Sequence, residues 1–214
     1  MTSQPHDTVP GLESSDAVAL TETLQSRLVA LLDLHLALKH IHWNVVGPSF
    51  LSVHQMLDDQ VGPVRDMSDE LAERIATLGG QPDGNPQAIV DGRDWDDYPL
   101  GRDTFLRHLH ALDGVYSGVI SSHREAITAT QVDPITEDIL IGQTRQLELF
   151  QWFVRSFVER AGADDESITE PGPATAAADA RGAHASHEAD RAPTADEAHK
   201  AEDLAAQTLS LIHI

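Results

Sequence analysis

The sequence contains no cysteine. Disulfide bonds, thiolate metal sites and cysteine nucleophiles are therefore excluded, and any metal ion must be held by imidazole nitrogen and carboxylate oxygen. Basic residues are also scarce, since 14 Lys and Arg stand against 35 Asp and Glu, which gives a formal net charge of -21. This balance repels nucleic acid and anionic membranes, so direct binding of DNA starts at a disadvantage.

Long apolar runs and an N-terminal targeting segment are also missing. No stretch approaches the roughly 20 apolar residues that a membrane-spanning helix needs, and no charged-then-apolar leader opens the chain. We therefore expect a cytoplasmic protein that makes no use of a membrane. At 214 residues and 23.2 kDa, the chain is long enough for one domain with its own core.

Apolar residues recur at helical spacing in four long segments. These are residues 16–45, a segment from Ser49 or Ser52 to Leu78, residues 103–130 and residues 134–161. Residues 81–100 contain too much Gly, Pro and Asp for a long helix, although residues 95–100 can form a short one. The sequence thus predicts an all-α, ferritin-like four-helix bundle with a long crossover between the second and third helices, covering residues 16–161.

The two ends of the chain differ in composition from the bundle. Residues 1–15 are polar and lack Lys and Arg, and residues 162–208 are rich in Ala, Asp, Glu and His with almost no large apolar side chain. Both segments are predicted to be disordered, because they cannot offset the entropy of ordering. Residues 209–214, Leu-Ser-Leu-Ile-His-Ile, match a translated sequencing adapter and are interpreted as an artefact; the alternative is a short apolar docking peptide.

Five side chains that can bind metal fall at helix-compatible spacings: His42, His54, Asp58, Asp69 and Glu73. On an ideal helix the last four lie within about 100° of one another. A solvated acidic face is the plain alternative for either i, i+4 pair. Asp58 and Asp69 are separated by roughly 16 Å along the axis, so one helix cannot close a site.

A second copy of the chain can complete that site. If two such helices pack antiparallel across a two-fold axis near Pro63, the His54 and Asp58 end of one faces the Asp69 and Glu73 end of the other. The symmetry then makes two identical sites. His42, on the preceding helix, is expected to contribute from the side of His54.

The donor set suits Fe(II), Mn(II) or Zn(II), and the affinity order alone does not choose between them. A di-iron site within one chain would need Glu-x-x-His pairs, and none occurs between residues 16 and 161. Trp43 is expected to pack in the core, with a role as electron donor as the alternative. His108, His110 and His123 are interpreted as surface or hydrogen-bonded core histidines.

Three segments resemble the Dps family of ferritin-like mini-cages. They are KHIHWNVVGPSF at residues 39–50, HQMLD at residues 54–58 and DELAERIATLGG at residues 69–80. The resemblance implies a shell of twelve subunits in which hydrogen peroxide or oxygen oxidises Fe(II) at sites shared by two-fold-related subunits. It places the iron ligands at His42, His54 and Asp58 of one subunit and at Asp69 and Glu73 of its neighbour. It also implies that Asp138 lines an acidic iron-entry pore on the three-fold axis.

The expected function is therefore that of a ferroxidase and iron store that protects DNA from oxidative damage. Many members of the family also coat DNA through Lys- and Arg-rich tails, whereas the segments outside the bundle here are mainly acidic. Two alternatives stay open: a nucleoid-associated, DNA-binding protection protein with little ferroxidase activity, and a dimer clamped by structural zinc or manganese.

Overall fold

The structure, a computed structural model, describes residues 9–166 apart from residue 94. These residues belong to one compact unit of the chain. Of the tail predicted at residues 162–208, residues 162–166 continue the last helix of the bundle, and the rest lies outside the described part, as do residues 209–214. None of the described helices has a stretch long and apolar enough to cross a membrane.

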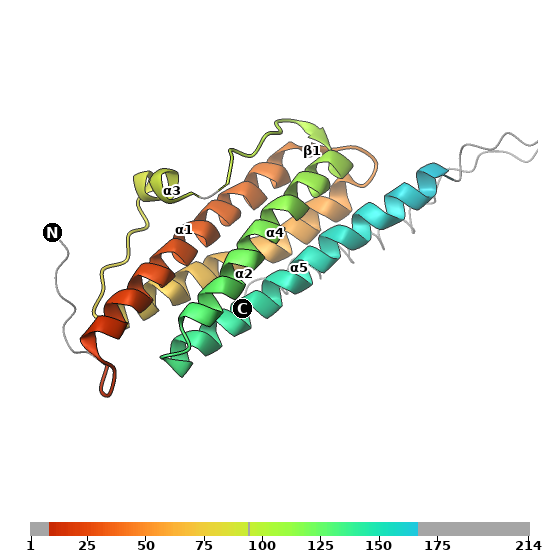
Figure 1. The fold of residues 1–214 in the computed structure, drawn as a ribbon. Coiled ribbons are helices and arrows are strands. Elements are labelled where there is room, and N and C mark those ends of the chain that lie inside the picture. Colours follow the sequence, from red (N-terminus) through yellow and green to blue (C-terminus); the bar gives the residue numbers. More distant parts are fainter. Residues whose placement is uncertain (1–8, 94, 167–214) are drawn as a thin grey trace, which may run out of the picture. The chain divides into compact units, whose positions relative to one another are not determined.

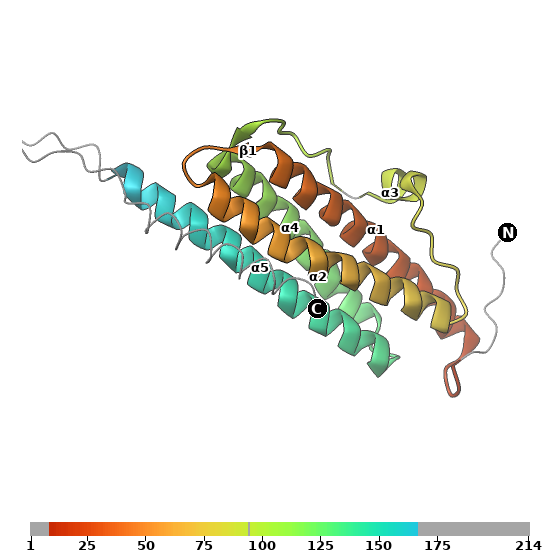
Figure 2. The ribbon, with the colours of Figure 1, turned by 180° about the vertical axis from the view of Figure 1, so that it is seen from behind.

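Four long helices form a bundle, as the apolar spacing predicted (Figure 1). They are α1 (Ser14–Asn44), α2 (Phe50–Thr77), α4 (Phe105–Ala129) and α5 (Pro134–Glu166). α1 packs along α2 and α4 along α5, and the long crossover makes α2 and α4 run in the same direction (Figures 1 and 2). Leucines of α1 at i, i+4 and i, i+7 spacing, such as Leu20, Leu24 and Leu31, are almost completely buried between the helices.

Glycine occupies the turn that follows α1 and the position that follows the end of α2. Gly47 has φ 114° and Gly79 has φ 85°, a conformation in which a side chain is strained. α2 runs through Pro63 without interruption, so the carbonyl of Asp59 lacks its usual helical donor. α5 begins at Pro134, where the Asp133 carboxylate accepts a hydrogen bond from the backbone N–H of Thr136 at 3.2 Å.

The crossover contains a short helix in a different place from the predicted one. Helix α3 spans Pro86–Gly92, while residues 95–100 are irregular, so the helix predicted at 95–100 is wrong. Proline suits the first position of a helix because it lacks an N–H that would go unpaired there, and Asn85 stands before it at the N-cap. Beyond α3, Arg93 binds the buried carboxylate of Asp33 on α1 through two hydrogen bonds of 2.8 and 2.6 Å.

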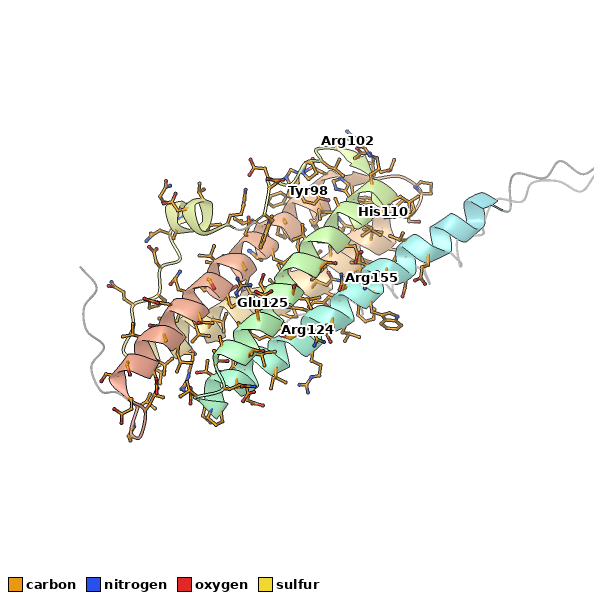
Figure 3. The ribbon with its side chains drawn as sticks, viewed as in Figure 1. Tyr98, Arg102, His110, Arg124, Glu125 and Arg155 are labelled. Atoms are coloured by element: carbon orange, nitrogen blue, oxygen red, sulfur yellow. The ribbon has the colours of Figure 1, made fainter. Side chains whose placement is uncertain are left out.

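A pair of short parallel strands joins the end of the crossover to the end of α1. β1 (Val45–Val46) pairs with β2 (Asp103–Thr104), with Val45 opposite Asp103. Beside this pair, His40 bonds the carbonyl of Leu100 at 2.7 Å, and the hydroxyl of Tyr98 lies 3.0 Å from Nδ1 of His108. Tyr98 is labelled in Figure 3, near the start of α4. The crossover is thereby fixed next to the part of α1 that carries His42.

Candidate metal centre

His42 from α1 and His54 and Asp58 from α2 lie together at one end of the bundle. One ligand atom from each lies within 4.8 Å of the others, and this is the one such group of His, Asp or Glu among the side chains that the structure describes, residues 9–159 apart from residue 94. His42 is buried, His54 is half-buried and Asp58 is exposed. The group therefore opens to the surface on its carboxylate side, where another chain or a solvated ion has access.

The two histidines hold each other through backbone carbonyls. Nδ1 of His42 lies 3.3 Å from the carbonyl of His54, and Nδ1 of His54 lies 3.1 Å from the carbonyl of His42. The two rings stack with centroids 3.6 Å apart. Because a carbonyl only accepts, each Nδ1 carries the proton, and each Nε2 keeps its lone pair for a metal ion.

Local electrostatics favour the neutral, metal-binding form of His42. Burial lowers the pKa of its ring, and the cation of Lys39 lowers it further, while Asp58 acts in the opposite direction. Nδ1 of His42 lies 3.2 Å from Oδ1 of Asp58. A ring that stays neutral at pH values below the usual histidine pKa does not have to lose a proton before it binds a metal ion.

Lys39 is a member of this group that the sequence reasoning missed. Its ammonium lies 3.1 Å from Oδ1 of Asp58 and 5.8 Å from the centre of the Trp43 ring. The lysine precedes His42 by three residues and therefore lies on the same side of α1. This spacing is the feature of the sequence that could have identified it. Its positive charge neutralises the carboxylate that a metal ion would need.

Asp69 and Glu73 lie elsewhere on the same chain. Both are exposed on α2, where they line a surface hollow together with Pro63, Asp66, Met67 and Glu70. We call this the acidic hollow. Within one chain these two carboxylates do not join His42, His54 and Asp58, since they are absent from the group that these three form in residues 9–166. The separation agrees with the roughly 16 Å that eleven helical residues span.

Other predicted positions divide between the surface and the core. Asp138 is exposed near the start of α5, and His110 is exposed on α4 (Figure 3). The prediction that Trp43 packs in the core is wrong for the single chain, because its side chain is 72% exposed. The buried positions of α1 include Leu38, Ile41 and His42, so residue 43 falls outside the apolar stripe.

A profile of the ferritin-like domain family matches residues 21–162. The DNA protection during starvation protein of Mycolicibacterium smegmatis is 50% identical over 169 residues, which cover 78% of this chain and 91% of that protein. The fine tangled pili major subunit of Haemophilus ducreyi is 48% identical over 158 residues, covering 73% of this chain and 84% of that protein.

Solved structures agree with these sequence matches. DpsA14 from Streptomyces coelicolor superposes with a TM-score of 0.71 at 55% identity, covering 73% of this chain and 94% of that chain. Dps of Mycobacterium smegmatis in its tetragonal form gives a TM-score of 0.70 at 51% identity, covering 71% of this chain and 94% of that chain.

Proposed function

Because the chain belongs to the Dps family of ferritin-like proteins, we propose that it oxidises Fe(II) with hydrogen peroxide or oxygen and stores the product as a ferric mineral. Iron is the substrate and cargo in this proposal. The observation that supports it is the group of His42, His54 and Asp58, in which one ligand atom from each side chain lies within 4.8 Å of the others.

The other half of the site is proposed to come from a second copy of the chain. Residues 54 and 73 and residues 58 and 69 have the same mid-point, between Pro63 and Val64. An antiparallel α2–α2 contact centred there would bring Asp69 and Glu73 of the partner subunit opposite His54 and Asp58. Two equivalent sites per dimer result, and we propose that such dimers assemble into the shell of twelve subunits.

The chemistry is a two-electron reduction of peroxide. Two Fe(II) ions and one hydrogen peroxide, with two protons, give two Fe(III) ions and two waters. The imidazoles of His42 and His54 suit Fe(II), and the carboxylates of Asp58, Asp69 and Glu73 stabilise the higher charge of Fe(III). Consuming both Fe(II) and peroxide removes the reactants that form hydroxyl radical, and this fits the name of the relatives, DNA protection during starvation.

Mixed assemblies provide the sharpest test of a shared site. One variant carries His54→Ala and Asp58→Ala, and the other carries Asp69→Ala and Glu73→Ala. Each alone should lose fast peroxide-dependent oxidation of Fe(II) while still assembling. Co-expressed chains form mixed dimers in which one of the two sites has all its ligands, so random pairing should restore about a quarter of the wild-type sites. Loss of activity in both variants without recovery in the mixture would contradict the shared site.

The oxidant and the competing functions need separate measurements. The first measurement is the amount of oxygen and of peroxide consumed per Fe(II) added. If peroxide is the oxidant, one peroxide should be consumed for every two Fe(II). A structural zinc or manganese clamp predicts no such consumption and an anomalous scattering signal from the other metal. Strong retardation of DNA by the intact assembly at physiological salt would favour the DNA-binding alternative.

A further inference from the structure

Two polar contacts join the second half of α2 to α5. The buried Gln143 side chain of α5 donates its amide nitrogen to the carbonyl of Met67 at 3.2 Å and to Oε2 of Glu70 at 2.8 Å. Seven residues earlier in α5, Oγ1 of Thr136 accepts a hydrogen bond from Nε of Arg74 at 3.0 Å. Met67 and Arg74 are also seven residues apart, so the two helices are joined at two points that lie about 10.5 Å apart on each helix.

These contacts flank the two proposed ligands on the second half of α2. Met67 and Glu70 lie on either side of Asp69 in the sequence, and both ligands are exposed. Arg74 directly follows Glu73. On an ideal helix the three contact residues lie within about 60° of one another, and the two ligands point roughly 110° away from them. α5 therefore holds one side of the helix and leaves the two carboxylates free to face another chain.

The two halves of α2 have separate polar support. Pro63 lies inside the helix and has no backbone N–H, so one helical hydrogen bond is missing between the halves. The first half is tied to α1 by the reciprocal bonds of His42 and His54 with backbone carbonyls. The second half is tied to α5 by the two contacts described above. The two ends of α2 that would take part in metal binding are thus placed by two different neighbouring helices.

We propose that Gln143 is a positioning residue of the shared metal centre. Its bonds to α2 set the rotation of the helix at which Asp69 and Glu73 face the partner subunit. This role rests on the proposed function, because only a shared site uses these two carboxylates. A side-chain oxygen lies about 6 Å from the helix axis, so a rotation of about 10° displaces it by about 1 Å. That displacement exceeds the roughly 0.5 Å within which the groups of a functional site must be held.

The bonds of Gln143 suit this role because they are directional and start from a packed side chain. Gln143 is 3% exposed, so its side chain has little freedom to follow a moving helix. One acceptor is the backbone carbonyl of Met67, so that bond fixes the helix itself. The other is the Glu70 carboxylate, which lines the acidic hollow together with Asp69 and Glu73. A single buried amide therefore connects the interior of the bundle to the surface that carries the proposed ligands.

Replacing Gln143 with methionine removes both bonds with little change in volume. The fold should tolerate Gln143→Met, because the Met67 carbonyl keeps its place in the helix and the Glu70 carboxylate is exposed to water. Anaerobic titration of the assembled variant with Co(II), as a stand-in for Fe(II), should give a Kd about tenfold higher than that of the wild type. Gln143→Asn, whose amide is one methylene too short to reach α2, should show the same loss.

The matched control is His123→Leu. His123 of α4 contacts Gln143 on a side chain that also bonds α2. Its replacement changes the buried surroundings of Gln143 but leaves the bonds to Met67 and Glu70 in place. The Kd for Co(II) should therefore stay at the wild-type value, even where the melting temperature falls.

Mixed assemblies show which half of the site Gln143 affects. Co-expression of Gln143→Met with the chain carrying His54→Ala and Asp58→Ala gives mixed dimers. In each of them one site combines the histidines of the first chain with the normal acidic half of the second. Random pairing makes these about a quarter of all sites, and they should bind Co(II) with the wild-type Kd. Co-expression with the chain carrying Asp69→Ala and Glu73→Ala forms no such site, so no wild-type class should appear there.

Three results would overturn the positioning role alone. They are a wild-type Kd in both Gln143 variants, an equal rise of the Kd in His123→Leu, and equal behaviour of the two mixtures, which a general loss of stability would produce. Failure of the wild-type protein itself to bind Co(II) would instead overturn the proposed shared site, and the role of Gln143 with it.

Discussion

Replacing Lys39 with methionine is expected to tighten the binding of a divalent metal. The ammonium lies 3.1 Å from Oδ1 of Asp58, and a metal ion on that oxygen would lie about 2.1 Å beyond it. Lysine and metal would then be about 5 Å apart, and their repulsion in a water-like dielectric is about 1.7 kcal/mol. That regime is appropriate because the Asp58 side chain is 51% exposed.

Screening by salt reduces this repulsion to about 1 kcal/mol, which corresponds to a roughly fivefold lower Kd for Lys39→Met. Methionine keeps most of the aliphatic stem, so packing against Trp43 changes little. Anaerobic titration calorimetry of the assembled protein with Co(II), which mimics Fe(II) without being oxidised, measures the change. Arg124→Met is the matched control, since it removes the same charge from a residue that pairs with Glu148. Unchanged or weaker Co(II) binding in Lys39→Met would refute the reasoning.

Three further predictions concern stability and DNA. Arg93→Met should lower the free energy of unfolding by about 3 kcal/mol in chemical denaturation, because the buried Asp33 carboxylate loses its partner. Burial alone would raise the pKa of Asp133, but hydrogen bonds from Thr136 and Arg74 bring it below its ordinary value of 3.8. Its contribution is therefore present above pH 3.8 and lost as the pH falls through the lower folded-state value, so the melting temperatures of wild type and Asp133→Asn should converge in acid. With a formal charge of -21, the full chain should not retard DNA at physiological salt in a gel assay.

The sequence predicted the long helices well because their positions repeat on one face for many turns. The end of α2 lies close to Gly79 and the start of α5 follows Asp133 at Pro134, which are the residue types that usually mark helix ends and helix starts. The crossover was harder to predict, since its helix is only one or two turns long and depends on packing against α1. The pairing of β1 with β2 had no sequence signal, because two residues are too few to show an alternating pattern.

At the candidate site, sequence reasoning selected residues by their ability to bind metal, so it could not identify residues that act on the site in another way. It selected His42, His54 and Asp58, which the fold brings together. It passed over Lys39, because lysine is not a ligand and its effect depends on a contact between α1 and α2. It could not find the reciprocal bonds of the two histidines with backbone carbonyls, because such bonds depend on the angle between two helices.

The short strand pair has a consequence for engineering the ends of the chain. The pairing of residues 45–46 with residues 103–104 joins the two ends of the segment that contains α2 and the crossover, and it does so beside His42. The histidine pair is thus anchored by three chain segments that all lie between residues 40 and 108. Fusion of a cargo or a reporter protein after residue 166 therefore leaves every one of those anchors in place.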